Sequence, residues 1–190
     1  MPATTVLPDV ERSTEWDADS LYEIINGKRV EVPRMGMMAV LVASYLAEVL
    51  GLHATRNRLG FVLVEALFRL AAVSRSRRPD LSFVSFDRWP YAAFPEDDPA
   101  ELDLAPNLAI EVISPTNTSI EIEDKIQDYF RSGVELVWVV YPRHRRAYVY
   151  DSPTRTRILS DKDALDGGNV LKGFKLPLSE LFNALSKPSK

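Results

Sequence analysis

Three ionisable residues interrupt apolar patterns in this sequence, and together they could carry out metal-assisted hydrolysis. Asp80 follows Pro79 at the start of a predicted strand, and Glu111 lies inside the most apolar strand candidate, residues 108–113. Lys125 falls on the inward-facing stripe of a predicted helix. A carboxylate in a buried strand is costly unless a cation or hydrogen bonds compensate for its charge. The pattern therefore predicts that Glu111 has a cationic partner.

Two carboxylates on neighbouring strands form the incomplete oxygen cage that Mg²⁺ prefers, because this ion keeps several waters and binds substrate phosphates. A cation held by Asp80 and Glu111 could bind a phosphodiester oxygen and lower the pKa of an attacking water. The ammonium of Lys125 would neutralise the charge that develops in the transition state. These residues predict a phosphodiesterase that depends on Mg²⁺ or, in its place, Mn²⁺.

The composition excludes several other kinds of site. The chain has 190 residues, no cysteine and two histidines, which excludes a thiol nucleophile, a disulfide framework and cysteine-ligated zinc or iron–sulfur sites. The longest uninterrupted apolar run, residues 37–43, is too short to span a bilayer, and residues 1–20 do not resemble a signal peptide. We therefore expect a cytoplasmic protein with no membrane partner.

The net charge of −4 is unevenly distributed along the chain. Residues 1–20 and 87–106 hold much of the acid, which leaves the rest mildly basic. Arginines gather at Arg75, Arg77 and Arg78 and again within residues 143–146. Such clusters can contact a phosphate backbone, or they can simply solvate turns.

The pattern of elements predicts a single domain over residues 21–185, with a flexible acidic arm at 1–20 and a short tail at 186–190. Asn26-Gly27 predicts a hairpin turn, and the apolar spacing over 37–50 predicts a core helix that ends at Gly51. Strands are expected at 61–70 and 80–86, separated by a basic turn at 74–78. A proline-rich acidic loop follows over residues 87–106, and its Trp89, Tyr91 and Phe94 could mediate self-association.

The second half of the chain has the pattern of an α/β domain. A buried strand at 108–113 precedes a helix that begins with the capping box of Thr118 and Glu121 and ends at Gly133. The next strand, 134–141, predicts a right-handed βαβ crossover, and residues 147–150 would return antiparallel to it. The sheet is therefore expected to be mixed, with the apolar segment 173–182 packed back on the domain.

The order and spacing of these motifs, from residue 21 to about 182, resemble the Uma-type putative restriction endonucleases of the PD-(D/E)XK superfamily. The matching segments are Tyr22-Glu23-Ile24-Ile25-Asn26-Gly27, Pro79-Asp80, Glu111-Val112-Ile113-Ser114-Pro115, Lys125, the strand with Trp138, Gly173-Phe174, Leu176-Pro177-Leu178 and Glu180-Leu181-Phe182. The resemblance implies a restriction-endonuclease-like core: a mixed central β-sheet flanked by helices.

The resemblance also implies an activity and the residues that perform it. Asp80 and Glu111 would ligate the metal, Glu23 would be an auxiliary acid near it, and Lys125 would be a catalytic lysine that has moved onto the helix. The usual position of that lysine is Ile113 in this chain. The substrate would be DNA, with Arg75, Arg77 and Arg78 on its backbone, and a homodimer would supply one site for each strand.

Other interpretations of these residues stay open from the sequence. Glu111 and Lys125 could form a purely structural buried pair, and Asp80 could pair with Arg77 or Arg78. Lys125 could extend from the edge of its stripe and Glu23 could be a surface charge, while Glu65 could face either solvent or the site. Relatives often carry a histidine where this chain has Gly36-Met37-Met38, so a catalytically inactive module that binds nucleic acid or a protein is the main alternative. A glycosidase with Glu111 and Asp80 as acid and base would leave Lys125 without a role.

Overall fold

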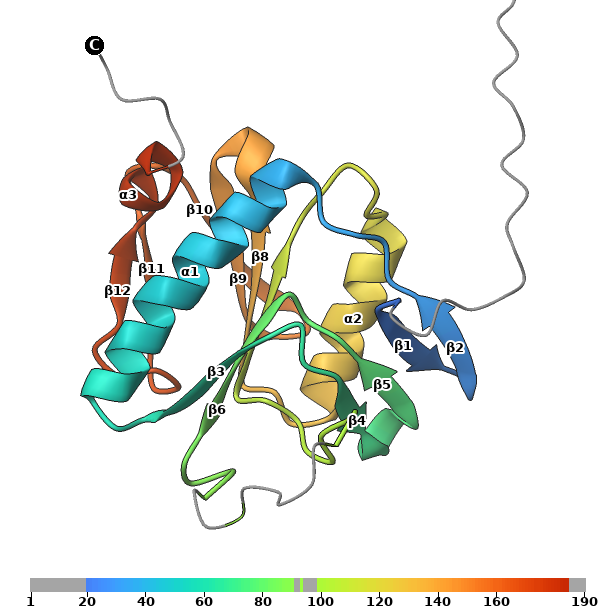
Figure 1. Ribbon diagram of the computed structural model, residues 1–190. Coiled ribbons are helices and arrows are strands. Elements are labelled where there is room, and N and C mark those ends of the chain that lie inside the picture. Colours follow the sequence, from blue (N-terminus) through green and yellow to red (C-terminus); the bar gives the residue numbers. More distant parts are fainter. Residues whose placement is uncertain (1–19, 91–92, 94–98, 185–190) are drawn as a thin grey trace, which may run out of the picture.

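The computed structural model describes residues 20–90, 93 and 99–184 of the chain. Nearly all of the predicted arm, the predicted tail, and Tyr91 and Phe94 of the acidic loop lie outside these residues. The described part is a mixed α/β structure with helices on both faces of a central sheet (Figure 1). This confirms the predicted fold class.

Six strands form the central sheet in the order β10-β9-β8-β7-β6-β3. Only β7 and β8 pair in parallel, and every other neighbouring pair in this sheet is antiparallel. The strands are β3 (Gly60–Val64), β6 (Leu81–Ser85), β7 (Leu108–Val112), β8 (Leu136–Tyr141), β9 (Arg146–Ser152) and β10 (Arg155–Leu159). The predicted mixed sheet, with a helix joining its parallel strands, is thus confirmed.

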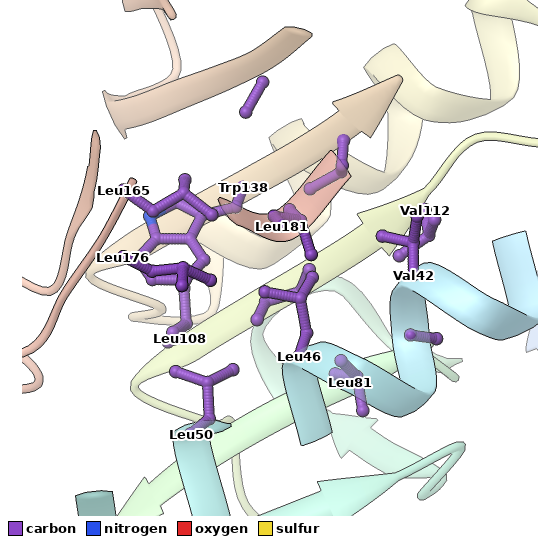
Figure 2. Packing of buried hydrophobic residues seen from close by; sticks show 14 of the residues in the cluster. Val42, Leu46, Leu50, Leu81, Leu108, Val112, Trp138, Leu165, Leu176 and Leu181 are labelled. Atoms are coloured by element: carbon purple, nitrogen blue, oxygen red, sulfur yellow. The ribbon is translucent and has the colours of Figure 1, made fainter. Parts of the chain in front are cut away.

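One face of this sheet is covered by the helix α1 (Met37–Arg56) and by the end of the chain. Leu46 and Leu50 of α1 pack against alternate residues of the sheet, among them Leu108 and Trp138 (Figure 2). The segment after β10 completes this layer with β11 (Ala164–Asp166), β12 (Lys175–Pro177) and α3 (Leu178–Asn183). The predicted return of residues 173–182 onto the domain is confirmed.

The helix α1 does not end at Gly51, as its sequence predicted. It continues to Arg56, because Leu50 and Ala54 are both buried and extend the same apolar stripe past the glycine. The packing of this stripe outweighs the low helix propensity of a single glycine. By length and composition α1 could cross a membrane, but a core helix passes the same test, and its buried stripe packs on the sheet.

The helix α2 (Ser119–Arg131) lies on the opposite face of the sheet, and a second, smaller sheet packs beside it (Figure 1). The capping box of Thr118 and Glu121 is present as predicted. The second sheet has the strand order β2-β1-β5-β4. Its members are β1 (Tyr22–Ile25), β2 (Lys28–Glu31), β4 (Phe68–Leu70) and β5 (Arg75–Arg77), and the predicted hairpin at Asn26-Gly27 joins the first two.

Two predicted boundaries in this region are wrong. Residues 61–70 form two strands in different sheets. The extended backbone is interrupted at Glu65, whose φ of 49° is left-handed. The basic segment 74–78 is not a turn, because Arg75–Arg77 form the strand β5 between β1 and β4. The turn is the short helix η1 (Ala71–Val73) before it. Side-chain partners of the arginines, which local sequence does not reveal, hold this segment in the sheet.

Candidate active site

Asp80 and Glu111 lie at the same edge of the central sheet. Asp80 directly precedes β6, whose first residue, Leu81, pairs with Ile110 of the antiparallel strand β7. The Asp80 carboxylate accepts a hydrogen bond of 2.5 Å from the backbone N–H of Val112 at the end of β7. The topology therefore brings together two acids that are 31 positions apart in the sequence.

Glu111 points to the face of the sheet that α2 covers. Its neighbours Ile110 and Val112 belong to the apolar cluster beneath α1, so the alternation of β7 turns Glu111 the other way. Its side chain is only 3% exposed. One carboxylate oxygen accepts a hydrogen bond from Lys125 Nζ at 3.0 Å, and the other accepts one from the Tyr129 hydroxyl at 2.6 Å. The predicted cationic partner of Glu111 is thus Lys125.

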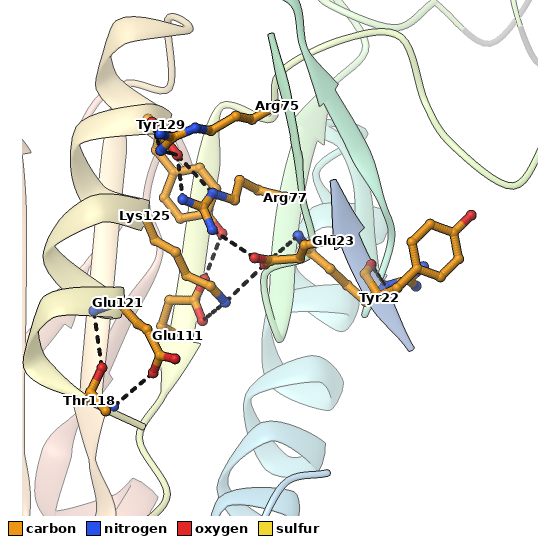
Figure 3. A network of polar contacts seen from close by, with 11 residues as sticks. Tyr22, Glu23, Arg75, Arg77, Glu111, Thr118, Glu121, Lys125 and Tyr129 are labelled. Atoms are coloured by element: carbon orange, nitrogen blue, oxygen red, sulfur yellow. Dashed lines mark hydrogen bonds and ion pairs between the residues drawn. The ribbon is translucent and has the colours of Figure 1, made fainter. Parts of the chain in front are cut away.

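Lys125 lies between two carboxylates rather than at the edge of its stripe. The capping box fixes the start of α2, and Lys125 and Tyr129, one turn apart, both reach Glu111 (Figure 3). Lys125 Nζ also lies 3.1 Å from the Glu23 carboxylate. Glu23 comes from β1, so this ammonium joins the small sheet to the central sheet.

Glu23 is a buried residue with cationic partners, which excludes its interpretation as a surface charge. It accepts hydrogen bonds from Arg77 Nη1 at 2.8 Å and from the backbone N–H of Arg78 at 3.0 Å. With Lys125 on one oxygen as well, both oxygens of Glu23 are engaged by the protein. Glu23 therefore lies next to Lys125, and its role as an auxiliary acid near the metal stays a prediction.

Arg77 is turned into the protein by two carboxylates. Its side chain is 4% exposed, and its guanidinium binds Glu23 and also Asp128 of α2, at 2.6 Å. Arg75 binds the same Asp128 at 3.0 Å. Arg77 therefore belongs to the interior and is not exposed to a phosphate backbone, contrary to what its cluster suggested. Asp128 was not singled out from the sequence, although it lies three residues after Lys125 on the same side of α2.

Arg78 is half-buried and contacts the N-terminal hairpin. Its guanidinium lies 5.6 Å from the centre of the Tyr22 ring and donates hydrogen bonds to the backbone oxygens of Tyr22 and Glu65. Neither Arg77 nor Arg78 forms an ion pair with Asp80 among the described residues. The alternative pairing of Asp80 with these arginines is thus not found there.

The acids of the site differ in the direction of their pKa shifts, because their charged neighbours differ. Burial and the neighbouring charge of Glu111 raise the pKa of Asp80 to about 7. Burial also raises the pKa of Glu111, against the opposing effect of Lys125. Burial alone would raise the pKa of Glu23, but Lys125 and Arg77 hold that pKa below its usual value. The pKa of Lys125 is raised despite burial, because Glu111 and Glu23 stabilise its ammonium.

Asp80 is the acid of this site that is most open to a divalent cation, because Glu111, like Glu23, already has both carboxylate oxygens engaged by the protein. The Asp80 carboxylate lies near the Glu111 carboxylate, and the one hydrogen bond that it accepts within the described residues comes from the Val112 N–H. A cation between Asp80 and Glu111 would relieve their mutual repulsion. Within the described ranges no group of three or more His, Cys, Asp or Glu side chains is arranged around a single metal position. The residues thus fit an ion that takes two carboxylates and completes its shell with water and phosphate, as Mg²⁺ does.

Glu65 adjoins this site. The alternation of its predicted strand left open whether Glu65 faces solvent or the site. Its backbone N–H donates to the backbone oxygen of Asp80 at 3.0 Å, and its charge adds to the rise in the pKa of Asp80. Glu65 is also one of the residues that line a cavity next to the site. The left-handed backbone conformation of Glu65 is held by hydrogen bonds to Asp80 and Arg78. No local sequence pattern indicates these hydrogen bonds.

Both a family model and a solved structure match most of the chain. A family model described as Uma2, putative restriction endonuclease, matches residues 9–179. A crystal structure of a putative nuclease belonging to DUF820 from Anabaena variabilis superposes with a TM-score of 0.77 at 20% sequence identity. The match covers 87% of this chain and 91% of that one. No curated protein matches the chain.

Proposed function

The chain belongs to the Uma2 family of putative restriction endonucleases, and from this membership and the geometry of its polar site we propose that it is a Mg²⁺-dependent nuclease that hydrolyses phosphodiester bonds in DNA. The observation that carries the proposal is the convergence of Asp80, Glu111 and Lys125 at one sheet edge. A purely structural pair would need only Glu111 and Lys125, and Asp80 would then be a costly additional acid.

In this mechanism Asp80 and Glu111 would hold the cation. When bound, the ion would supply Lewis acidity to the phosphodiester and lower the pKa of the attacking water. Lys125 keeps its proton, because the charges of Glu111 and Glu23 raise its pKa, so it does not act as a general base. Its fixed ammonium would instead stabilise negative charge that develops on the phosphate.

Tyr129 and Arg77 fix the positions of the residues that would bind the cation and the phosphate. The Tyr129 hydroxyl, 2.6 Å from a Glu111 oxygen, fixes the orientation of that carboxylate. Arg77 holds Glu23, which in turn holds Lys125. The chemistry therefore depends on groups whose positions are set before substrate binds.

Exposed arginines at the same sheet edge are better placed for DNA than Arg77. The strand β8 runs parallel to β7, so the segment after it lies at the edge where β7 ends. This segment, η3 (Pro142–His144), carries the exposed Arg143, and Arg146 follows at the start of β9. We infer that Arg143 and Arg146 contact the phosphate backbone, with Arg75 as a partly exposed third contact. The homodimer and the cytoplasmic location stay predictions from the sequence.

Calorimetric titration of Mg²⁺ and Mn²⁺, together with plasmid nicking on the same samples, tests the proposal. We expect Glu111→Gln to abolish metal binding and to slow nicking by at least about 100-fold. The matched control is Glu135→Gln, which removes a carboxylate that is 51% exposed and paired with Arg88. Nicking by Glu111→Gln at the rate of the control, with both variants folded, would refute the assignment.

A module that binds nucleic acid without cutting it is the second candidate. The observation in its favour is that Lys125 already has two carboxylate partners, so its charge is balanced without any ligand. This candidate predicts that DNA binds to the parent protein with the same affinity in chelator and in Mg²⁺, and that no nicks form. The nicking assay above therefore separates the two candidates.

A further inference from the structure

A cavity of about 710 Å³ lies between the N-terminal hairpin, α1 and the end of β3. Part of its wall is apolar, formed by Val32, Val40 and Ala47, while Glu31, Arg34 and Glu65 supply charge. Its volume lies within the range of sites that bury a small organic ligand. The mixture of apolar wall and few polar groups is typical of such sites.

The cavity lies beside the candidate active site, because one of its lining residues, Glu65, is hydrogen-bonded to Asp80. The backbone N–H of Glu65 donates to the backbone oxygen of Asp80 at 3.0 Å, and Glu65 is one of the residues that line the cavity. Glu65 has a left-handed φ of 49°, a conformation that is unfavourable for a residue other than glycine. Two hydrogen bonds, one to Asp80 and one from Arg78, hold it there. A molecule in the cavity would thus adjoin a phosphodiester bound at Asp80.

The chemistry of the lining selects one kind of occupant. Two carboxylates disfavour a phosphate inside the cavity, but they can accept hydrogen bonds from an amino group. The apolar wall suits the flat faces of a ring, and the exposed Arg34 can meet an anionic phosphate outside. A nucleotide with an exocyclic amino group on its base combines these three features.

We propose that this cavity binds the unpaired nucleobase of a nucleotide next to the phosphodiester that is cut, with Glu65 accepting a hydrogen bond from the exocyclic amino group. The inference rests on the proposed nuclease function and adds a substrate class to it. In a duplex, the edge of the base that carries the exocyclic amino group is paired with the opposite base. The base must therefore be single-stranded or flipped out of the duplex to enter the cavity. Bases with an amino group are then preferred to thymine, whose O4 would face a carboxylate.

Titration of dCMP and dTMP into the full chain without metal tests the proposal independently of cleavage. We expect dCMP to bind about fivefold more tightly than dTMP, and single-stranded DNA to displace dCMP at about tenfold lower concentration than duplex DNA. The variant Glu65→Gln should lose the preference for dCMP, because an amide can donate to thymine as well as accept from cytosine. Glu48→Gln, which removes an exposed carboxylate of α1 outside the cavity lining, should keep it.

A second variant fills the cavity without changing charge. Ala47→Leu is compatible with the helix and should weaken dCMP binding at least about tenfold, whereas Thr55→Leu, at an exposed position of α1 outside the lining, should not. Failure of dCMP to bind, equal binding by Ala47→Leu, or a change in sedimentation of Ala47→Leu that points to a subunit contact would each overturn the proposal. Failure of this inference is separable from failure of the nuclease: Glu111→Gln should still bind dCMP, and a parent protein that nicks DNA in Mg²⁺ without binding dCMP would refute the cavity alone.

Discussion

The two faces of the central sheet are packed by different physical means. Beneath α1 the contacts are apolar, with Leu46, Trp138 and Leu165 fully buried (Figure 2). Beneath α2 the apolar contacts surround a chain of buried charges that includes Glu111 and Arg77 (Figure 3). Apolar burial stabilises a fold without directional demands, whereas buried ions stabilise it only when each one has its partner.

This difference indicates which face is organised for chemistry. A domain needs one well-packed core, and the cluster beneath α1 supplies it. Buried ion pairs are often no more stabilising than apolar side chains of the same volume. The charges on the α2 face are therefore better explained by what they position, namely Lys125 and Glu111, than by what they add to stability.

The variant with the largest expected effect removes the cation at the centre of the charged face. Arg77→Met takes a buried cationic partner from both Glu23 and Asp128, so we expect the free energy of unfolding to fall by about 3–5 kcal/mol. Urea denaturation at pH 7.5 measures it. Arg88→Met, which breaks an exposed pair with Glu135, is the control and should cost less than about 1 kcal/mol. Equal losses in the two variants would show that the charged face is no more sensitive than the surface.

Second-site substitutions show whether Arg77→Met loses stability because two carboxylates are left unpaired or because the packing of the arginine side chain is lost. Adding Glu23→Gln and Asp128→Asn to Arg77→Met should restore part of the lost stability, because no unpaired carboxylate is then left. The same triple variant should stay inactive in nicking, since Lys125 has lost one of its two carboxylates. Restored stability together with restored nicking would contradict the positioning role of Glu23.

The apolar face gives the second effect. Leu46→Ala removes a fully buried side chain of α1 and should lower the free energy of unfolding by about 3 kcal/mol through the cavity that it leaves. In contrast to Arg77→Met, it should leave the Mg²⁺ affinity of the folded protein unchanged within about twofold. Urea denaturation and calorimetry on the same samples check both. A tenfold weaker affinity for Mg²⁺ would show that the two faces are not independent.

How far the sequence could predict the structure differs between the two faces. The stripe of α1 and the nearly continuous apolar runs of β7 and β8 are local patterns, so the mixed sheet and its helices could be predicted from them. The end of α1 could not, because the packing of Leu50 and Ala54 outweighs Gly51. The strand β5 could not either, since Arg75–Arg77 has no apolar pattern and is held by partners distant in the sequence.

The candidate site shows the same limit. Glu111 and Lys125 could be predicted because each interrupts an apolar pattern, and the structure brings them together. Asp128 and Glu65 were not assigned, because their roles depend on residues from other strands: Arg77 for the first, Asp80 for the second. Sequence patterns thus locate buried charges that lack a local explanation, but not the remote partners that bind them.

Asp80→Asn should increase stability, the reverse of the Arg77 variant. The pKa of Asp80 is raised from 3.8 to about 7, so the folded protein holds a proton that the unfolded chain has released across that range. Stability is therefore lost as the pH rises from about 4 to about 7, and a neutral asparagine avoids the loss. We expect the variant to be at least about 2 kcal/mol more stable than the parent at pH 8 in chelator, and equal to it near pH 4. A stability difference that does not change between these two pH values would contradict the raised pKa.

The smallest effect concerns the start of α2, which carries Lys125 on the charged face. Thr118 accepts a hydrogen bond from the Glu121 N–H at 3.3 Å, and the Glu121 carboxylate accepts one from the Thr118 N–H at 3.0 Å. Thr118→Ala should cost about 1 kcal/mol in thermal or urea unfolding, and Thr118→Ser should retain the cap. Because Lys125 lies two turns further on and is held by Glu23 and Glu111, its position should survive, and Mg²⁺ affinity should change less than about twofold. A tenfold loss of affinity in Thr118→Ala but not in Thr118→Ser would instead mean that the helix start, rather than the buried ion pairs, sets the position of Lys125.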